Sequence, residues 1–251
     1  MLGMILAAGE GSRLRPLTLA RPKPMLPVAG RPILEHIIAW LRHYGVCRIA
    51  INLHHCPDVT PAYFGDGSAF GVSLTYSKEE QILGTAGGAK RLKNFLTETF
   101  VLVYGDVLTD MDLGALLELH RSKGPGPRVT MGLYHVPNPW ECGIVRLDDQ
   151  SRVTEFVEKP PKDAVFSDLA NSGVLVLEPE ILRYVPDETF YDFGKDVFPR
   201  LLADGVPLYG WVTPRDSYLL DIGSPAKYEQ AQTTWPTGRA KAYLPVAGGR
   251  Q

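Results

Sequence analysis

The sequence predicts an α/β fold built on a doubly wound, Rossmann-like sheet. Short apolar strands alternate with amphipathic helices through the first half, a glycine-bearing segment follows the first predicted strand, and an aspartate ends a later one. In such sheets ligands lie beyond the carboxyl ends of the strands, where both of these features fall. The chain has 251 residues, which is enough for one domain with a substantial core.

The elements of the first half are predicted from hydrophobic periodicity. Pro32 opens a helix with one apolar face, and Gly45 is placed to end it. Asp112 is expected to cap the helix that follows it. In chain order, the expected strands cover 4–8, 48–53 and 100–104, and the expected helices cover 32–44 and 113–122.

The second half has a different order of predicted elements: several strands follow one another closely, and helices come only near the end. The whole sheet is therefore expected to be mixed. Ser224 is a good N-cap with Pro225 at the first helical position. No repeat or long linker divides the chain, so we expect one domain over 1–232 and a Gly- and Pro-rich tail over 233–251. The expected strands are 129–136, 143–147, 152–157 and 174–177, and the expected helices are 195–203 and 225–232.

Composition excludes several classes of protein. The net charge of −2 and the pI of about 6.3 provide no basic field for nucleic acid. No apolar run approaches the roughly 18 residues that span a bilayer, and the N-terminal strand lacks a charged region typical of a signal peptide. The three cysteines lack C-x-x-C spacing and fit reduced thiols. We expect a cytoplasmic protein without nucleic acid or membrane partners, and assembly into a homo-oligomer is compatible with the sequence.

The segment after the first strand is suited to phosphate. Its glycines let backbone N–H groups approach phosphate oxygens, and Arg13, Arg15 and Lys23 supply positive charge. Leu14 stands where the dinucleotide fingerprint needs its third glycine, and no Gly-Lys-Ser/Thr of a P-loop opens a helix here. A tight surface turn with solvated arginines is the alternative.

The whole segment reads G-x-G-x-R-L-x-P-L-T, followed by K-P-M-L-P from Lys23. It resembles the signature of the sugar-nucleotide pyrophosphorylases, which join a nucleoside triphosphate to a sugar 1-phosphate. The resemblance implies a nucleotide-diphospho-sugar transferase fold, with a nucleotide half over about 1–125 and a sugar half over about 126–232. It implies Arg13 and Lys23 as catalytic residues, and as nucleotide-binding residues Leu6, Ala7, Ala8, Gly9, Gly11 and Ser12.

A metal site is predicted at the carboxyl end of a central strand. Asp106 is well placed there to ligate a hard divalent cation that also touches nucleotide phosphates, although an N-cap or turn aspartate would look the same. The resemblance implies Mg²⁺ as the cofactor and Asp221, within Y-L-L-D-I-G-S, as its second carboxylate. Two carboxylates completed by phosphate and water oxygens suit magnesium. A capping aspartate before the Ser-Pro helix start is the alternative for Asp221.

Further motifs imply contacts to sugar and base. Glu158-Lys159-Pro160 is similar to the E-K-P motif, whose lysine pairs with the sugar phosphate and whose glutamate binds sugar hydroxyls. Asn171 and Gly143 are implied sugar neighbours, although a solvated lysine, a buried structural asparagine and a strand-start glycine are ordinary alternatives. The L-G-T-A-G wording implies a loop against the base and ribose, formed by Gln81, Gly84 and Thr85, or else a flexible glycine turn.

The resemblance thus implies a sugar-1-phosphate nucleotidyltransferase, an EC 2.7.7 type enzyme. The K-P-M-L-P and L-G-T-A-G motifs are most similar to those of the members that use GTP and mannose 1-phosphate. A UTP- or dTTP-dependent enzyme acting on glucose, heptose or N-acetylmuramate phosphate, and a non-catalytic regulatory homologue, remain alternatives. A Rossmann oxidoreductase lacks its third glycine and has Asn52 and His54 where an acidic residue is needed. The short stretch after Gln232 leaves no hexapeptide-repeat β-helix domain to expect.

Overall fold

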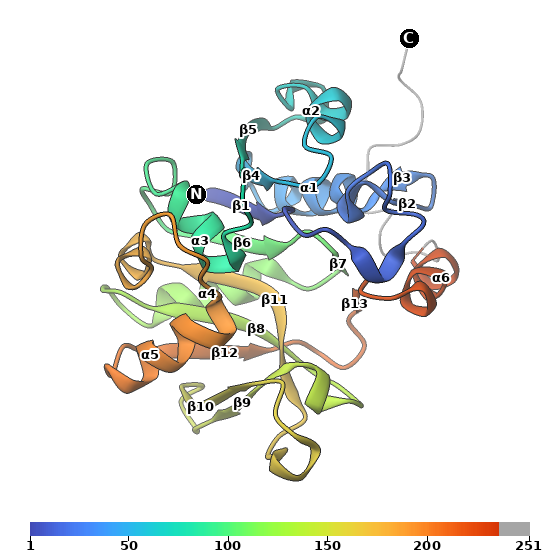
Figure 1. Cartoon of the computed structure of the whole chain (residues 1–251). Coiled ribbons are helices and arrows are strands. Elements are labelled where there is room, and N and C mark those ends of the chain that lie inside the picture. Colours follow the sequence, from blue (N-terminus) through green and yellow to red (C-terminus); the bar gives the residue numbers. More distant parts are fainter. Residues whose placement is uncertain (236–251) are drawn as a thin grey trace.

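The computed structural model describes residues 1–235, which form a mixed sheet with helices on both faces (Figure 1). Within these residues the main sheet has nine strands. Seven of them follow the order β10-β9-β11-β6-β1-β4-β5, and the other two are β8, which pairs with β11, and β12, which pairs with β8. The strands are β1 Leu2–Leu6, β4 Arg48–Leu53, β5 Ser73–Lys78, β6 Phe100–Tyr104, β8 Val129–His135, β9 Gly143–Leu147, β10 Val153–Glu158, β11 Leu169–Leu177 and β12 Leu208–Val212.

The other elements are helices and two short ribbons. The ribbons join β2 Pro27–Val28 with β3 Arg31–Pro32, and β7 Val107–Thr109 with β13 Leu219–Asp221. None of the helices within residues 1–235 has the length and apolar character needed to cross a bilayer. The α-helices are α1 Ile33–His43, α2 Val59–Phe64, α3 Gly84–Arg91, α4 Leu113–Ser122, α5 Phe198–Ala203 and α6 Pro225–Thr234.

The fold class predicted from the sequence is confirmed. β1 runs parallel to both β4 and β6, and β4 runs parallel to β5, as the alternation of strands and helices requires. β11 then joins β6 in the antiparallel sense and makes the sheet mixed. The early strands β5, β4, β1 and β6 therefore lie on one side of the sheet, and the later strands lie on the other (Figure 1).

Side chains of the central strands alternate between two cores. Leu2 and Met4 of β1 enter one core, whereas Ile5 enters the other. This is the period of two expected for a strand buried on both faces. The core that contains Ile5 also holds the apolar faces of α1 and α4, and the core that contains Met4 holds those of α3 and α5. Because helices cover both faces of the sheet, a ligand can reach it only at the ends of the strands.

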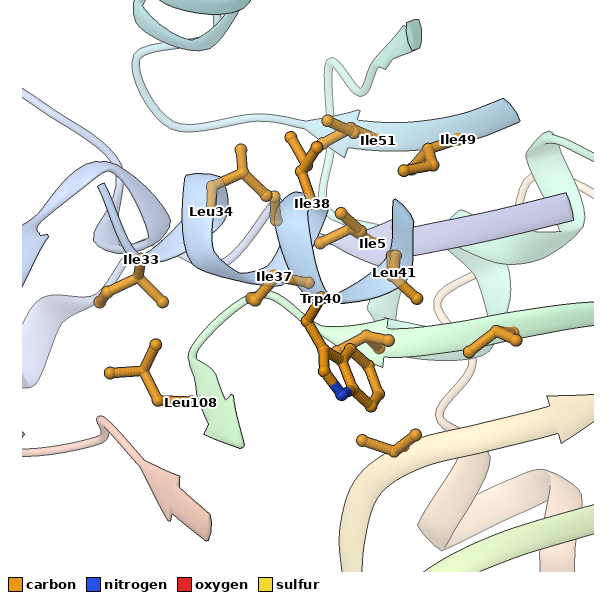
Figure 2. Close-up of a cluster of buried hydrophobic side chains, with 14 of the residues drawn as sticks. Ile5, Ile33, Leu34, Ile37, Ile38, Trp40, Leu41, Ile49, Ile51 and Leu108 are labelled. Atoms are coloured by element: carbon orange, nitrogen blue, oxygen red, sulfur yellow. The ribbon is translucent and has the colours of Figure 1, made fainter. Parts of the chain in front are cut away.

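Helix α1 shows how the first of these cores is packed. Figure 2 shows side chains of α1, among them Ile38 and Leu41, pointing toward Ile5 of β1 and toward β4. Trp40 is buried on the same helix and its Nε1 donates to the Met111 carbonyl at 3.0 Å. The indole therefore fills apolar space without leaving its N–H unpaired.

Replacing Ile38 with alanine is expected to lower the free energy of unfolding by about 2–5 kcal/mol. Ile38 is 1% exposed, so the lost atoms leave a cavity between α1 and the sheet. Urea denaturation measures the difference. Leu19→Ala is the matched control, because Leu19 is 62% exposed and its loss creates no cavity. Equal destabilisation by both substitutions would contradict this packing.

Several elements differ from the expectation because tertiary contacts extend or replace them. The helix expected over 195–203 begins as a π-helical turn, Phe193–Val197, before α5. The strand expected over 174–177 begins at Leu169, since its first part pairs with β8. The glycine-rich segment expected to be a loop is the start of α3.

The end of the described chain is anchored to α1. Helix α6 continues past the expected Gln232 to Thr234, and Trp235 is buried. Trp235 Nε1 donates to His36 Nδ1 at 3.1 Å, and His36 Nε2 donates to the Val28 carbonyl at 2.9 Å. The imidazole is thus used on both nitrogens in its neutral form, and burial lowers its pKa. The rest of the predicted tail, 236–251, lies outside the described residues.

Candidate functional site

The segment that follows β1 is held by a buried polar network. Ala7 N donates to Asn52 Oδ1 at 2.8 Å, and Asn52 Nδ2 donates to Glu79 Oε1 at 2.7 Å. Glu79 Oε2 accepts a further bond from Leu83 N at 3.0 Å. The network joins the ends of β1, β4 and β5 to the start of α3. It fixes the glycine-bearing segment relative to the segment that the sequence predicts beside the base.

Gly11 sets the path of the chain toward Arg13. It has φ +62°, and a Cβ there would lie 3.0 Å from Thr18 Cγ2 and 3.1 Å from Lys23 Cβ. A side chain would be strained by both the backbone and the space, so glycine is required. A 3-10 helix over Ser12–Leu14 follows and carries Arg13 toward the loop after β13. A Cβ at Gly223 of that loop would lie 3.7 Å from Arg13 Nη2.

The short ribbon of β7 and β13 brings the two predicted metal-binding carboxylates together. Asp221 pairs in register with Val107, the residue after Asp106, and Ile222 N donates to the Asp106 carbonyl at 2.9 Å. Burial raises the pKa of the Asp221 carboxyl, and the Asp106 charge raises it further. The two groups therefore repel each other, and a cation between them would be stabilised.

Two lysines partly neutralise this pair. Lys23 Nζ forms an ion pair with Asp106 Oδ2, and Lys227 Nζ lies 3.4 Å from Asp221 Oδ2. Within residues 1–235, no group of three or more His, Cys, Asp or Glu side chains is arranged to hold an ion. The donor set here is two carboxylates, which fits a hard cation that takes its other oxygens from water and substrate phosphates.

Glu158 ends β10 in a space that two glycines keep open. A Cβ at Gly143 would lie 2.5 Å from Glu158 Oε2, and one at Gly194 would lie 2.6 Å from it. Burial raises the pKa of the Glu158 carboxyl, the nearby Asp192 charge adds to this, and Lys159 opposes it. Gly143 therefore serves the predicted glutamate, because any side chain there would displace its carboxylate.

Lys159 has a strained backbone beside this glutamate. Its φ is +51°, which is rare for a residue with a side chain, and its N–H donates to the Cys142 carbonyl at 3.0 Å. Lys159 Nζ lies 3.7 Å from Glu158 Oε1, and the side chain is 61% exposed. Strain of this kind is typical of functional sites, where surrounding contacts hold a side chain in a required direction.

Asn171 lies on the irregular part of β11. The pairing of β11 with β8 shifts between Asn171 and Leu175, and Gly173 has φ +77°. Asn171 Oδ1 accepts from Gly173 N at 3.1 Å, which stabilises the bulge. Asn171 also lines the larger cavity described next, so its structural role and its predicted sugar contact are compatible.

Two neighbouring cavities occupy the carboxyl end of the sheet. The larger has a volume of about 790 Å³, and the smaller has a volume of about 310 Å³. They share lining residues from different elements, so they adjoin along a common wall, and the pair is called the double cavity below. The shared residues are Thr85, Tyr104, Asp106 and Asp192.

Most residues that the sequence singled out line this site. The smaller cavity is lined by Leu6, Ala7, Ala8, Gly9, Lys23, Gly84, Thr85 and Asp106. The larger cavity is lined by Arg13, Thr85, Asp106, Gly143, Glu158, Lys159, Asn171 and Asp221. Three predicted nucleotide contacts are among the described residues but line neither cavity, namely Gly11, Ser12 and Gln81.

The glycines near Gly84 have a packing role that the sequence reading did not anticipate. A Cβ at Gly84 would lie 2.5 Å from the Tyr191 carbonyl oxygen, and one at Gly87 would lie 2.5 Å from the Thr189 carbonyl oxygen. A Cβ at Gly88 would lie 2.5 Å from Asn52 Nδ2. These glycines let α3 pack closely on the 189–191 backbone and on the buried network.

Other lining residues were missed by the sequence reading. Asp192 accepts from Thr85 Oγ1 at 2.8 Å and from Gly194 N at 2.9 Å, which links α3 to the π-helical turn. No local motif marks it. Tyr104 directly precedes Gly105-Asp106, a position that could have drawn attention to it, and burial raises the pKa of its phenol. Lys227 lies in the first turn of α6, and only its spacing of six residues from Asp221 could have indicated that it lines the site.

Comparison with known proteins agrees with this fold. Residues 2–237 match the nucleotidyl transferase family, so the chain belongs to that family, as its motifs predicted. A UTP–glucose-1-phosphate uridylyltransferase from Synechocystis is 37% identical over 243 residues, which cover 92% of this chain and 62% of the relative. A mannose-1-phosphate guanylyltransferase from Mycobacterium tuberculosis is 39% identical over 230 residues, which cover 90% of this chain and 62% of the relative.

Solved structures share the fold. A Bacillus anthracis protein crystallised with a sucrose superposes with a TM-score of 0.82 at 25% identity, covering 92% of this chain and 94% of that one. HddC from Yersinia pseudotuberculosis superposes with a TM-score of 0.76 at 24% identity, covering 94% of this chain and 100% of that one. This chain spans about 62% of the length of the two curated relatives above.

Proposed function

We propose that this chain transfers a nucleotidyl group from a nucleoside triphosphate to a sugar 1-phosphate, releasing pyrophosphate. The observation that carries the proposal is the pair of adjoining cavities, with Asp106 in the wall that both share. A reaction that joins two substrates needs two adjoining binding spaces with the reacting groups at their junction. The family and the activities named for its relatives support the same reaction.

The chemistry of the linings supports one substrate for each cavity. The smaller cavity contains the glycine-bearing segment and Lys23 together with mostly apolar neighbours, which suits a triphosphate attached to a flat base. The larger cavity is rich in charged and polar groups, which suits a polyol bearing a phosphate. Its charged lining residues are Arg13, Lys159, Lys227, Asp106, Glu141, Glu158, Asp192 and Asp221.

In the proposed reaction, an oxygen of the sugar phosphate attacks the α-phosphorus in line. A new phosphorus–oxygen bond forms as the bond to the β-phosphate breaks, and pyrophosphate leaves with that electron pair. Lys23 holds the triphosphate from within the smaller cavity, and Arg13 reaches its phosphates from the wall of the larger cavity, so that both balance its charge. Lys159 orients the attacking phosphate against the repulsion between two anions. Such transfers depend mainly on alignment and charge neutralisation.

Magnesium is the proposed cofactor, held by Asp106 and Asp221. Their shared negative charge and oxygen donors fit a hard divalent cation. When bound, the ion would supply positive charge to the phosphate oxygens. Lys23 and Lys227 would then be available to phosphate groups instead of pairing with the carboxylates.

GTP and mannose 1-phosphate are the proposed substrates, from the K-P-M-L-P wording and the guanylyltransferase relative. UTP and glucose 1-phosphate form the second candidate pair, because a uridylyltransferase relative has a similar identity, 37% against 39%. The presence of Arg13, Lys23, Asp106, Lys159 and Asp221 favours a catalyst over a regulatory homologue.

A pyrophosphate-release assay tests this function. Each of the four common triphosphates is combined with mannose, glucose, heptose and N-acetylmuramate 1-phosphates in the presence of magnesium. The expected result is release that requires both substrates, with one pair preferred by at least about tenfold in kcat/KM. Binding of substrates without release from any pair would contradict an enzyme and favour a regulatory protein.

A further inference from the structure

Phe190 is exposed at the rim of the smaller cavity. Its side chain is 63% exposed, more than any other large apolar side chain among residues 1–235, and the residue lines the cavity. An isolated exposed aromatic ring needs no explanation on an ordinary surface. At the rim of a cavity it offers an apolar face to whatever enters.

The backbone around Phe190 is firmly held. Tyr191 N donates to the Leu83 carbonyl at 2.9 Å, and the Tyr191 carbonyl accepts from Ala86 N at 2.9 Å and from Gly87 N at 3.1 Å. Because Gly84 and Gly87 have no side chain, α3 can pack this closely against the backbone of residues 189–191. The exposed ring therefore projects from a fixed backbone, which reduces the entropy lost when a ligand binds to it.

Ile82 is a second apolar side chain that lines the same cavity as Phe190. Ile82 and Phe190 are the residues that precede the bonded pair Leu83 and Tyr191, and both line the smaller cavity. Gln81, which the sequence predicts to contact the base, is exposed and does not line it. This part of the cavity is thus apolar, and it lies in the same space as the glycine-bearing segment and Lys23.

We propose that Phe190 is the stacking platform for the nucleobase of the triphosphate, with Ile82 as its apolar neighbour. The inference rests on the proposed function in that it takes the smaller cavity as the triphosphate site. A ring face binds the π-face that every base possesses, so the contact adds affinity without choosing the base. Choice between bases is then left to polar groups that meet the base edge.

Calorimetric binding of GTP and of UTP, with magnesium and without sugar phosphate, tests the platform. Phe190→Ala is expected to weaken both triphosphates by about 10- to 100-fold, as loss of one base–aromatic stack does. Binding of inorganic tripolyphosphate, which has no base, should stay within about twofold. Phe190→Trp should restore triphosphate binding, because it supplies another ring. Val212→Ala, at an exposed apolar position on β12, is the control and should change nothing.

The outcomes separate the platform from the proposed function. If Phe190→Ala binds GTP and UTP like the unaltered protein, or weakens tripolyphosphate equally, the platform is wrong while pyrophosphate release can still support the enzyme. If the unaltered protein binds triphosphate through Phe190 but releases no pyrophosphate, the platform stands and the catalytic proposal fails. If the unaltered protein binds neither GTP nor UTP, a platform that accepts every base is overturned, while pyrophosphate release with the remaining triphosphates still decides the catalytic proposal.

Discussion

Asp106→Asn is expected to abolish magnesium-dependent pyrophosphate release, with a loss of at least about 1000-fold. The substitution keeps the size of the side chain but removes half of the paired negative charge at the β7–β13 ribbon. The pair of carboxylates then no longer attracts a divalent cation, and Lys23 loses its ion-pair partner. Steady-state assays over a range of magnesium concentrations measure the effect.

Asp112→Asn is the matched control for this prediction. It makes the same chemical change six residues further along the chain. Asp112 caps α4 by accepting from Ala115 N at 3.2 Å, and asparagine caps a helix equally well. Activity should be unchanged. Binding of Mn²⁺ to the two variants, followed by electron paramagnetic resonance, supplies a readout other than turnover. Normal turnover and Mn²⁺ binding in Asp106→Asn would place the metal elsewhere.

Lys159→Ala is expected to raise the KM for sugar 1-phosphate by at least about tenfold, which corresponds to one charge-assisted hydrogen bond. The KM for the triphosphate should change far less, because Lys159 lines the larger cavity and not the smaller one. Alanine and lysine share the Cβ that makes φ +51° unfavourable, so the backbone strain is not altered by the change. Initial rates with each substrate varied in turn measure both constants.

Lys78→Ala provides the comparison for Lys159. Its ammonium pairs with Asp58 where both side chains are exposed, so its removal should affect stability and both KM values little. Similar increases in both KM values for Lys159→Ala would contradict a specific role in holding the sugar phosphate. A change in kcat alone would contradict it as well, because binding of one substrate is the step assigned to this side chain.

Local sequence determined most of the secondary structure. Residues 48–53, 100–104 and 113–122 have the same bounds in the structure as in the prediction. Buried strands and amphipathic helices can be predicted locally because each has a characteristic spacing of apolar residues. Capping was also readable, because Asp112 and Ser224 act on backbone groups within three residues. Strands β7 and β13 were missed, since three residues carry too little pattern, and the longer strands β5 and β12 were not predicted either.

The motifs of the site could be recognised individually from the sequence. The glycine-bearing segment, Asp106 and Glu158-Lys159 all lie at strand ends, and each lines the double cavity. The glycine-rich segment near Gly84 was misread as a loop. Its glycines are needed because the 189–191 backbone, distant in sequence, packs against α3.

The sequence by itself determined the family, the order of the elements and the kinds of side chain available for phosphate and metal. Only the tertiary structure decided which of them meet. The register of β7 with β13 joins Asp106 to Asp221, and the backbone bonds of Tyr191 to the start of α3 hold Phe190 at the smaller cavity. These contacts depend on strand register and on packing between distant segments, which no local period of hydrophobicity encodes.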